Sequence, residues 1–161
     1  MSVMSWQLPR APLRDRVLFL LVVGTALTGL LAAVVLPLVG PAPAFRARAS
    51  LVFAAAGAFA LGHLRDQHPF DSFGPANAVT SLRLMLVSMV AALLGEAASP
   101  ASAVVATALA LVVTALDGVD GWLARRSGMA SAFGARFDME TDALLILVLA
   151  LLAWQHGSAG A

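Results

Sequence analysis

The chain has 161 residues, of which 60% are hydrophobic and only 12% are charged. A soluble domain carries about 25% charged residues, so the composition argues against a soluble protein and favours one that spans a membrane. The ten basic residues are all Arg, and the net charge is +1. No basic face with interleaved aromatic residues is apparent, so nucleic-acid binding is not expected. The chain has no Cys, which excludes disulfides and thiolate chemistry.

Long apolar runs predict an all-α bundle of about five transmembrane helices, because a helix needs about 20 residues to cross a bilayer. Residues 1–16 are polar and are expected to form a cytoplasmic N-terminal segment. The run 17–39 predicts the first helix, and the small residues from about 50 to 64 predict a second helix that packs closely. We therefore expect residues 17–64 to form a transmembrane hairpin.

The second half of the chain is expected to hold three more helices. Residues 65–78 contain Pro, Gly and polar residues, which predict a loop or surface segment. Apolar runs predict helices at 79–94, 101–124 and 132–154. These helices form a core, 79–156, which carries the acidic residues described below. The tail, 157–161, is expected to be irregular.

The distribution of Arg predicts the orientation of these helices in the membrane. With the N-terminus in the cytoplasm, Arg46 and Arg48 lie outside and the other eight Arg lie on the cytoplasmic side. A bacterial cytoplasmic membrane is the expected location. Glu96, between two predicted helices, is expected to be a solvated loop charge.

Four Asp residues stand at helical spacings near the expected cytoplasmic ends of two helices. Asp117 and Asp120 are three residues apart, and Asp138 and Asp142 are four apart, so each pair shares one helix face. A short turn joins the two helices, so we expect them to run antiparallel and adjacent, with their acidic faces meeting. Glu140 lies two residues from both Asp138 and Asp142 and is expected to point to a different face.

Clustered carboxylates repel one another in a low dielectric. Oxygen ligands suit Mg²⁺ or Mn²⁺, and two such ions would balance four carboxylates. The cluster contains neither His nor Cys, so zinc is not expected. His63 and His68 are expected to be loop or interface residues rather than ligands. A two-metal carboxylate site is suited to phosphoryl transfer.

Small and basic residues accompany the acidic ones. Gly121 and Gly134 lack side chains, so a bulky ligand can approach the helices there. Arg125 can hold a phosphate through a forked pair of hydrogen bonds. These features predict a phosphate-containing substrate beside the metal site.

The spacing D-x2-D-G-x2-A-R-x8-G-x3-D-x3-D, kept in full between Asp117 and Asp142, resembles the signature of the CDP-alcohol phosphotransferases. In this chain the pattern consists of Asp117, Asp120, Gly121, Ala124, Arg125, Gly134, Asp138 and Asp142. Upstream, Asn77, Thr80 and Arg83 fit the N-x-x-T-x-x-R element that family members often carry at the start of the preceding helix.

The resemblance implies a six-helix membrane core, usually a homodimer, with a cytosol-facing site for a CDP-alcohol and two Mg²⁺ or Mn²⁺ ions. It implies that a phosphatidyl or other phospho-alcohol group passes from a CDP-alcohol such as CDP-diacylglycerol to a hydroxyl acceptor, and that CMP leaves. By match, the metal ligands are Asp117, Asp120, Asp138 and Asp142, of which Asp142 is also the general base. The residues implied to bind substrate are Gly121, Ala124, Arg125, Gly134, Asn77, Thr80 and Arg83.

The chain also departs from the family pattern. Only the helices at 79–94, 101–124 and 132–154 correspond to the six-helix core, so the last three family helices are expected to be absent. Ala143 stands where phosphatidylglycerophosphate synthases commonly have Lys, which disfavours that specificity. For Arg83 and Arg136, topology and binding of an acceptor's phosphate remain alternatives.

Two other functions remain open at this point. One is a catalytically inactive fragment, and the other is a cation-binding or transport protein that uses the same acidic cluster. Release of CMP in the presence of Mg²⁺ would separate the enzyme from both.

Overall fold

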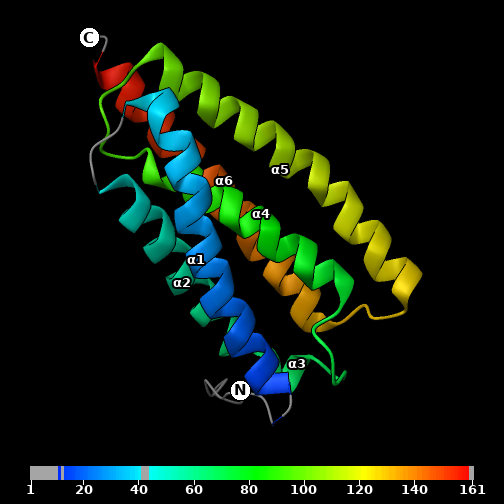
Figure 1. Ribbon diagram of the computed structural model, residues 1–161. Helices are drawn as coiled ribbons and strands as arrows, with labels where there is room; N and C mark the ends of the chain where they lie inside the picture. The colour runs from blue at the N-terminus through cyan, green and yellow to red at the C-terminus, as the bar shows by residue number, and fades with distance from the viewer. Residues whose placement is uncertain (1–10, 12, 41–43, 160–161) are drawn as a thin grey trace, which may run out of the picture.

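A computed structural model describes residues 11, 13–40 and 44–159 and shows helices joined by short connections throughout this part of the chain (Figure 1). The expectations for residues 1–10 and 160–161 lie outside the described residues. The six helices are α1 (Leu13–Val39), α2 (Phe45–Leu61), α3 (Leu64–Gln67), α4 (Pro75–Ala92), α5 (Pro100–Ser127) and α6 (Ala132–Ala159). The prediction of an all-α fold with five long helices is confirmed.

Several helix boundaries differ from the prediction. α4 begins at Pro75 rather than at 79, because Gly74 turns the chain with a φ of +82° and Pro75 then starts the helix. α6 continues to Ala159, past the predicted end at 154. The segment expected to be a loop between the hairpin and the core also contains the single-turn helix α3.

Three of the described helices are long and apolar enough to cross a bilayer, namely Leu13–Val35, Pro75–Ala92 and Pro100–Ser127. This is fewer than the five spans expected, since α2 has 17 residues and α6 carries several charged residues in its first half. Large apolar side chains are exposed on these helices, among them Phe19 on α1 and Leu111 on α5. Lipid is the environment in which such surfaces are stable.

α4 lies at the centre of the bundle, and α1, α2, α5 and α6 all pack against it. In Figure 1, α5 lies on one side of α4, and α1 and α2 lie on the other. The expectation that α5 and α6 would pack against each other is wrong in this respect: they run antiparallel, but each packs chiefly on α4. The reason is that α4 brings buried polar side chains into the space where the two acidic faces were expected to meet.

Small residues bring α1 and α2 together, as the sequence predicted for this hairpin. A Cβ added at Gly57 on α2 would lie 2.7 Å from a methyl carbon of Leu21, and one at Gly24 on α1 would lie 2.5 Å from the ring of Phe53. Both glycines therefore permit a close approach, and a larger residue at either position would displace the facing side chain.

A polar contact ties together the ends of α2, α4 and α6. The Arg48 guanidinium forms an ion pair with Glu96 and donates a hydrogen bond to the Leu94 carbonyl at 2.5 Å. Gln155 Nε2 donates to the Glu96 carbonyl at 2.7 Å. The expectation that Glu96 is a solvated charge is wrong, because its side chain is only 11% exposed and pairs with Arg48. Hence Glu96 neutralises the charge of Arg48, which is one of the two Arg expected on the outer side.

Candidate functional site

One face of α4 presents three buried polar side chains. Asn77, Thr80 and Arg83 follow one another at intervals of three residues, so they form one stripe along the helix. All three are buried, and Arg83 is fully so. A stripe of this kind inside an apolar bundle needs polar partners on the neighbouring helices.

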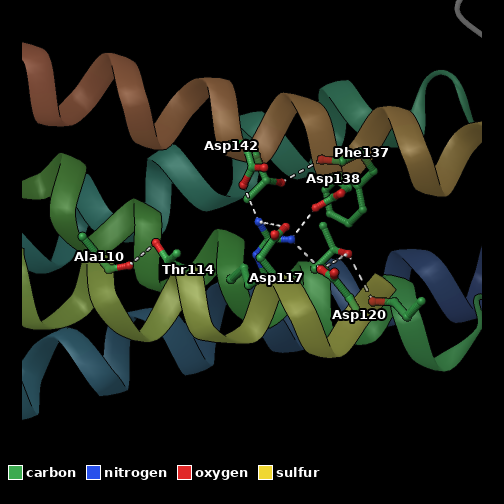
Figure 2. Close-up of polar contacts among 11 residues, drawn as sticks. Ala110, Thr114, Asp117, Asp120, Phe137, Asp138 and Asp142 are labelled. Carbon is green, nitrogen blue, oxygen red and sulfur yellow. Dashed lines mark hydrogen bonds and ion pairs between the residues drawn. The ribbon is translucent and has the colours of Figure 1, made fainter. Parts of the chain in front are cut away.

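The partners come from α5 and α6. Figure 2 shows Asp117 and Asp120 on α5 and Asp138 and Asp142 on α6, all directed into the space between the two helices. One carboxylate oxygen from each of Asp117, Asp120 and Asp138 lies within 4.8 Å of the others. The Asp120 side chain is 4% exposed, whereas those of the other three acids are between 37% and 47% exposed. The prediction that the acids of the two helices come together is confirmed, but α4 contributes a side chain between them.

The guanidinium of Arg83 occupies the centre of this acidic cluster. Nη1 donates to Asp120 Oδ2 at 2.5 Å and also contacts Asp138. Nη2 pairs with Asp117 Oδ1 at 2.9 Å and also contacts Asp142. Sequence reasoning did not anticipate this position, since Arg83 was assigned to a phosphate or to topology and not to the acids themselves.

The donor set fits a divalent cation. All four groups are carboxylates, which are the hard oxygen ligands that Mg²⁺ and Mn²⁺ prefer. They converge on one point, and the structure already holds a cationic group there, the Arg83 guanidinium. Four carboxylates and one guanidinium sum to a formal charge of 4 × (−1) + 1 = −3. The cluster therefore remains negatively charged and attracts cations.

A pocket of about 280 Å³ adjoins the cluster, between α4, α5, α6 and the connection before α6. Asp120 and Asp138 belong to both the cluster and the pocket wall. The residues predicted to bind substrate that line this pocket are Asn77, Thr80, Gly121, Ala124, Arg125 and Gly134. Arg83, the seventh, does not line it.

The two glycines of the pocket have different roles. A Cβ at Gly134 would lie 2.9 Å from Asn77 Oδ1, so a larger residue there would displace the Asn77 side chain. A Cβ at Gly121 would lie 3.4 Å from Arg125 Nη1, so the Arg125 side chain extends back over Gly121 toward the pocket. The neighbouring Arg126 instead stacks on Trp122, with its guanidinium carbon 5.3 Å from the ring centroid.

Comparison with known families identifies the part of the chain that carries this site. Residues 73–160 match the profile of the CDP-alcohol phosphatidyltransferases, which is more than half of the 161 residues. The chain belongs to the CDP-alcohol phosphatidyltransferase family. No curated protein and no solved structure matches the chain.

Members of the CDP-alcohol phosphatidyltransferase family are transferases of phospholipid biosynthesis, and they typically use a divalent metal ion. The matched segment contains α4, α5 and α6, and therefore the whole acidic cluster and its pocket. The hairpin of α1 and α2 lies outside the match and packs against α4 from the other side.

A hydrogen-bonded chain that sequence reasoning missed fixes the connection before α6 in this family member. His68 Nε2 lies 2.8 Å from the Ser72 carbonyl, which can only accept, so this nitrogen carries the proton. In a neutral ring, Nδ1 then accepts from the Ser131 hydroxyl at 3.0 Å. Ser131 Oγ in turn accepts from the backbone N–H of Gly134 at 3.1 Å and caps α6.

His68 thus holds the pocket wall through Ser131, which itself lines the pocket. The Ser directly before α6 was the one signal in the sequence, because Ser is a favoured N-cap residue. On another face of α6, Arg136 Nε donates to Glu140 at 2.7 Å. Glu140 is therefore outside the acidic cluster, as the sequence predicted.

Proposed function

We propose that this protein transfers a phosphatidyl or other phospho-alcohol group from a CDP-alcohol, such as CDP-diacylglycerol, to a hydroxyl acceptor and releases CMP. The observation that carries the proposal is the continuity between the acidic cluster and the pocket. Asp120 and Asp138 belong to both, so a diphosphate bound in the pocket lies beside the carboxylates.

The pocket residues are proposed to bind the nucleotide end of the CDP-alcohol. Arg125 lines the pocket with its guanidinium over Gly121, where it can donate a forked pair of hydrogen bonds to a phosphate. Asn77 donates its own Nδ2 to the Phe73 carbonyl at 2.5 Å, which fixes its oxygen toward Gly134 and the pocket. Thr80 and Ala124 complete the walls contributed by α4 and α5.

In the proposed reaction, the acceptor oxygen attacks the phosphorus that bears the lipid alcohol. A new oxygen–phosphorus bond forms, the bond to the CMP oxygen breaks, and CMP leaves with that electron pair. Two Mg²⁺ or Mn²⁺ ions held by Asp117, Asp120, Asp138 and Asp142 would stabilise charge on the attacking and leaving oxygens.

Asp142 is proposed to take the proton from the acceptor hydroxyl. Its side chain is 45% exposed, so it is open to an incoming acceptor in a way that the buried Asp120 is not. A positioned base of this kind is typically worth about 10²- to 10⁴-fold in rate.

We propose that the N-terminus and the site face the cytoplasm and that the protein acts as a homodimer. The orientation is supported by the Arg distribution together with the compensation of Arg48 by Glu96. The chain has no Cys, so single cysteines can be placed at Ser127 and Ser99. Membrane-impermeant labelling should reach them from opposite sides, and labelling from one side would refute the orientation.

The test of the proposed function is release of CMP from CDP-diacylglycerol by the purified protein in bilayers that contain Mg²⁺. A panel of hydroxyl acceptors identifies the second substrate. Release that depends on one acceptor supports the transferase. Binding of Mg²⁺ or Mn²⁺ without CMP release for any acceptor would contradict it and favour a cation-binding protein.

A further inference from the structure

We propose that Arg83 is the internal counter-ion of the acidic cluster and that divalent cations bind by competing with its guanidinium for the same carboxylates. This inference rests on the proposed metal site. It assigns to Arg83 a role toward the metal in place of the substrate-binding role that the sequence pattern implied.

The contact pattern supports this assignment. The two terminal nitrogens of a guanidinium carry four N–H groups, and in this structure they serve four carboxylates, two for each nitrogen. Nη1 bridges Asp120 and Asp138, and Nη2 bridges Asp117 and Asp142. Each nitrogen thus joins α5 to α6, so Arg83 holds the two acidic faces together across α4.

The remaining donor, Arg83 Nε, is buried and has no hydrogen-bond partner among the described residues. An unpaired buried donor is costly. Arg83 therefore pairs with the acids although its own Nε donor stays unpaired. This indicates that the charge of the cluster, rather than the packing around α4, determines where the side chain lies.

The charge balance shows why a divalent ion would compete. With Arg83 in place, the formal charge of the cluster is −3. A guanidinium supplies one positive charge, whereas a divalent ion supplies two at the same convergent point. The guanidinium also contacts one oxygen of each carboxylate, and a metal bound at the same point would compete for those oxygens. Pairing of Arg83 with the acids and binding of the metal therefore weaken each other, and each lowers the other's affinity for the acids by the same factor.

The test compares Arg83→Gln with wild-type protein in two measurements that do not require turnover. Mn²⁺ affinity is measured from the electron paramagnetic resonance signal of free Mn²⁺, and thermal unfolding is followed in EDTA and in saturating Mg²⁺. Arg126→Gln is the matched control, since Arg126 lies on the same helix as two of the acids but stacks on Trp122.

In Arg83→Gln we expect the dissociation constant for Mn²⁺ to fall by about tenfold or more, the change that corresponds to loss of a competing charge-assisted hydrogen bond. Its unfolding temperature should be lower than that of wild type in EDTA, and Mg²⁺ should raise it by more than it raises wild type. Arg126→Gln should match wild type in both measurements.

Arg83→Lys keeps one positive charge but has only three N–H groups on a single nitrogen, so its Mn²⁺ affinity should lie between those of wild type and Arg83→Gln. It also provides a folded comparison if Arg83→Gln unfolds in EDTA. If both Arg83 variants are folded in Mg²⁺ and bind Mn²⁺ no more tightly than wild type, the competition is refuted while the metal site stands. If wild type and all variants bind no Mn²⁺, the proposed metal site fails, and this inference fails with it.

Discussion

Two arginines lie between helices in this protein, and their charge balances differ. Arg48 faces one carboxylate, Glu96, and a backbone carbonyl, so its charge is matched. Arg83 faces four carboxylates and leaves a formal charge of −3. Replacing a matched buried pair by apolar residues is often neutral or stabilising, so such a pair by itself indicates no function.

The unmatched arginine requires another explanation. Three excess negative charges clustered between apolar helices are costly unless a cation is bound, so such a cluster indicates function. The comparison therefore separates a structural contact, Arg48 with Glu96, from a candidate metal site, Arg83 with its four acids.

The largest effect is expected from Asp120→Asn. Asp120 is the most buried of the four acids, accepts hydrogen bonds from Arg83 and from Thr80 Oγ1 at 3.2 Å, and lines the pocket. Loss of its charge should abolish detectable CMP release and weaken Mn²⁺ binding. Glu140→Gln is the control, because Glu140 pairs with Arg136 outside the cluster. Equal loss in both variants would show that the cluster has no special role.

Asp142→Asn is expected to affect metal binding less than Asp120→Asn does, but to lower the rate of CMP release strongly. If Asp142 acts chiefly as the base, single-turnover CMP release should fall by about 10²- to 10⁴-fold. Metal and CDP-alcohol should still bind. If Asp142→Asn loses metal as completely as Asp120→Asn, or keeps near-normal turnover, the base assignment is wrong.

Variants of the two adjacent arginines of α5 are expected to differ in their KM for the CDP-alcohol. Arg125→Gln should raise the KM for the CDP-alcohol by about 10- to 100-fold, because a hydrogen bond to a charged group contributes roughly 1.5–3 kcal/mol. Arg126→Gln should leave KM unchanged, since Arg126 stacks on Trp122 and does not line the pocket. Similar KM values for the two variants would argue against a phosphate-binding role for Arg125.

The smallest effect on activity is expected at the matched arginine. Arg48→Gln should lower the free energy of unfolding by roughly 1–3 kcal/mol, less than is typical when a fully buried pair is broken, because Arg48 is 32% exposed. Mn²⁺ affinity should not change. Adding Glu96→Gln should restore part of the lost stability. A changed Mn²⁺ affinity in Arg48→Gln would remove the distinction between the two arginines.

Much of the site could be predicted from the sequence because its residues lie on helices at spacings of three or four. Those spacings place Asp117 with Asp120, and Asp138 with Asp142, on single faces whatever the rest of the fold does. A short connection between the two helices then brings the faces together. Local geometry alone thus predicted the meeting of the acids.

The contacts that were missed join residues far apart in the chain. Arg83 is 37 residues from Asp120, and His68 is 63 residues from Ser131. Which helix lies between α5 and α6 depends on tertiary packing, and no local pattern specifies that α4 does so. For the same reason Glu96 was expected to be solvated, since its partner Arg48 comes from the start of α2.

We propose that the excess negative charge around Arg83 binds the divalent cations that the reaction requires. The most direct test of this proposal is CMP release by wild-type protein after treatment with EDTA, with metal removal confirmed by elemental analysis, followed by titration with Mg²⁺ or Mn²⁺. We expect no CMP release in EDTA and recovery of CMP release as the metal is added back. Full turnover in the metal-free protein would contradict it.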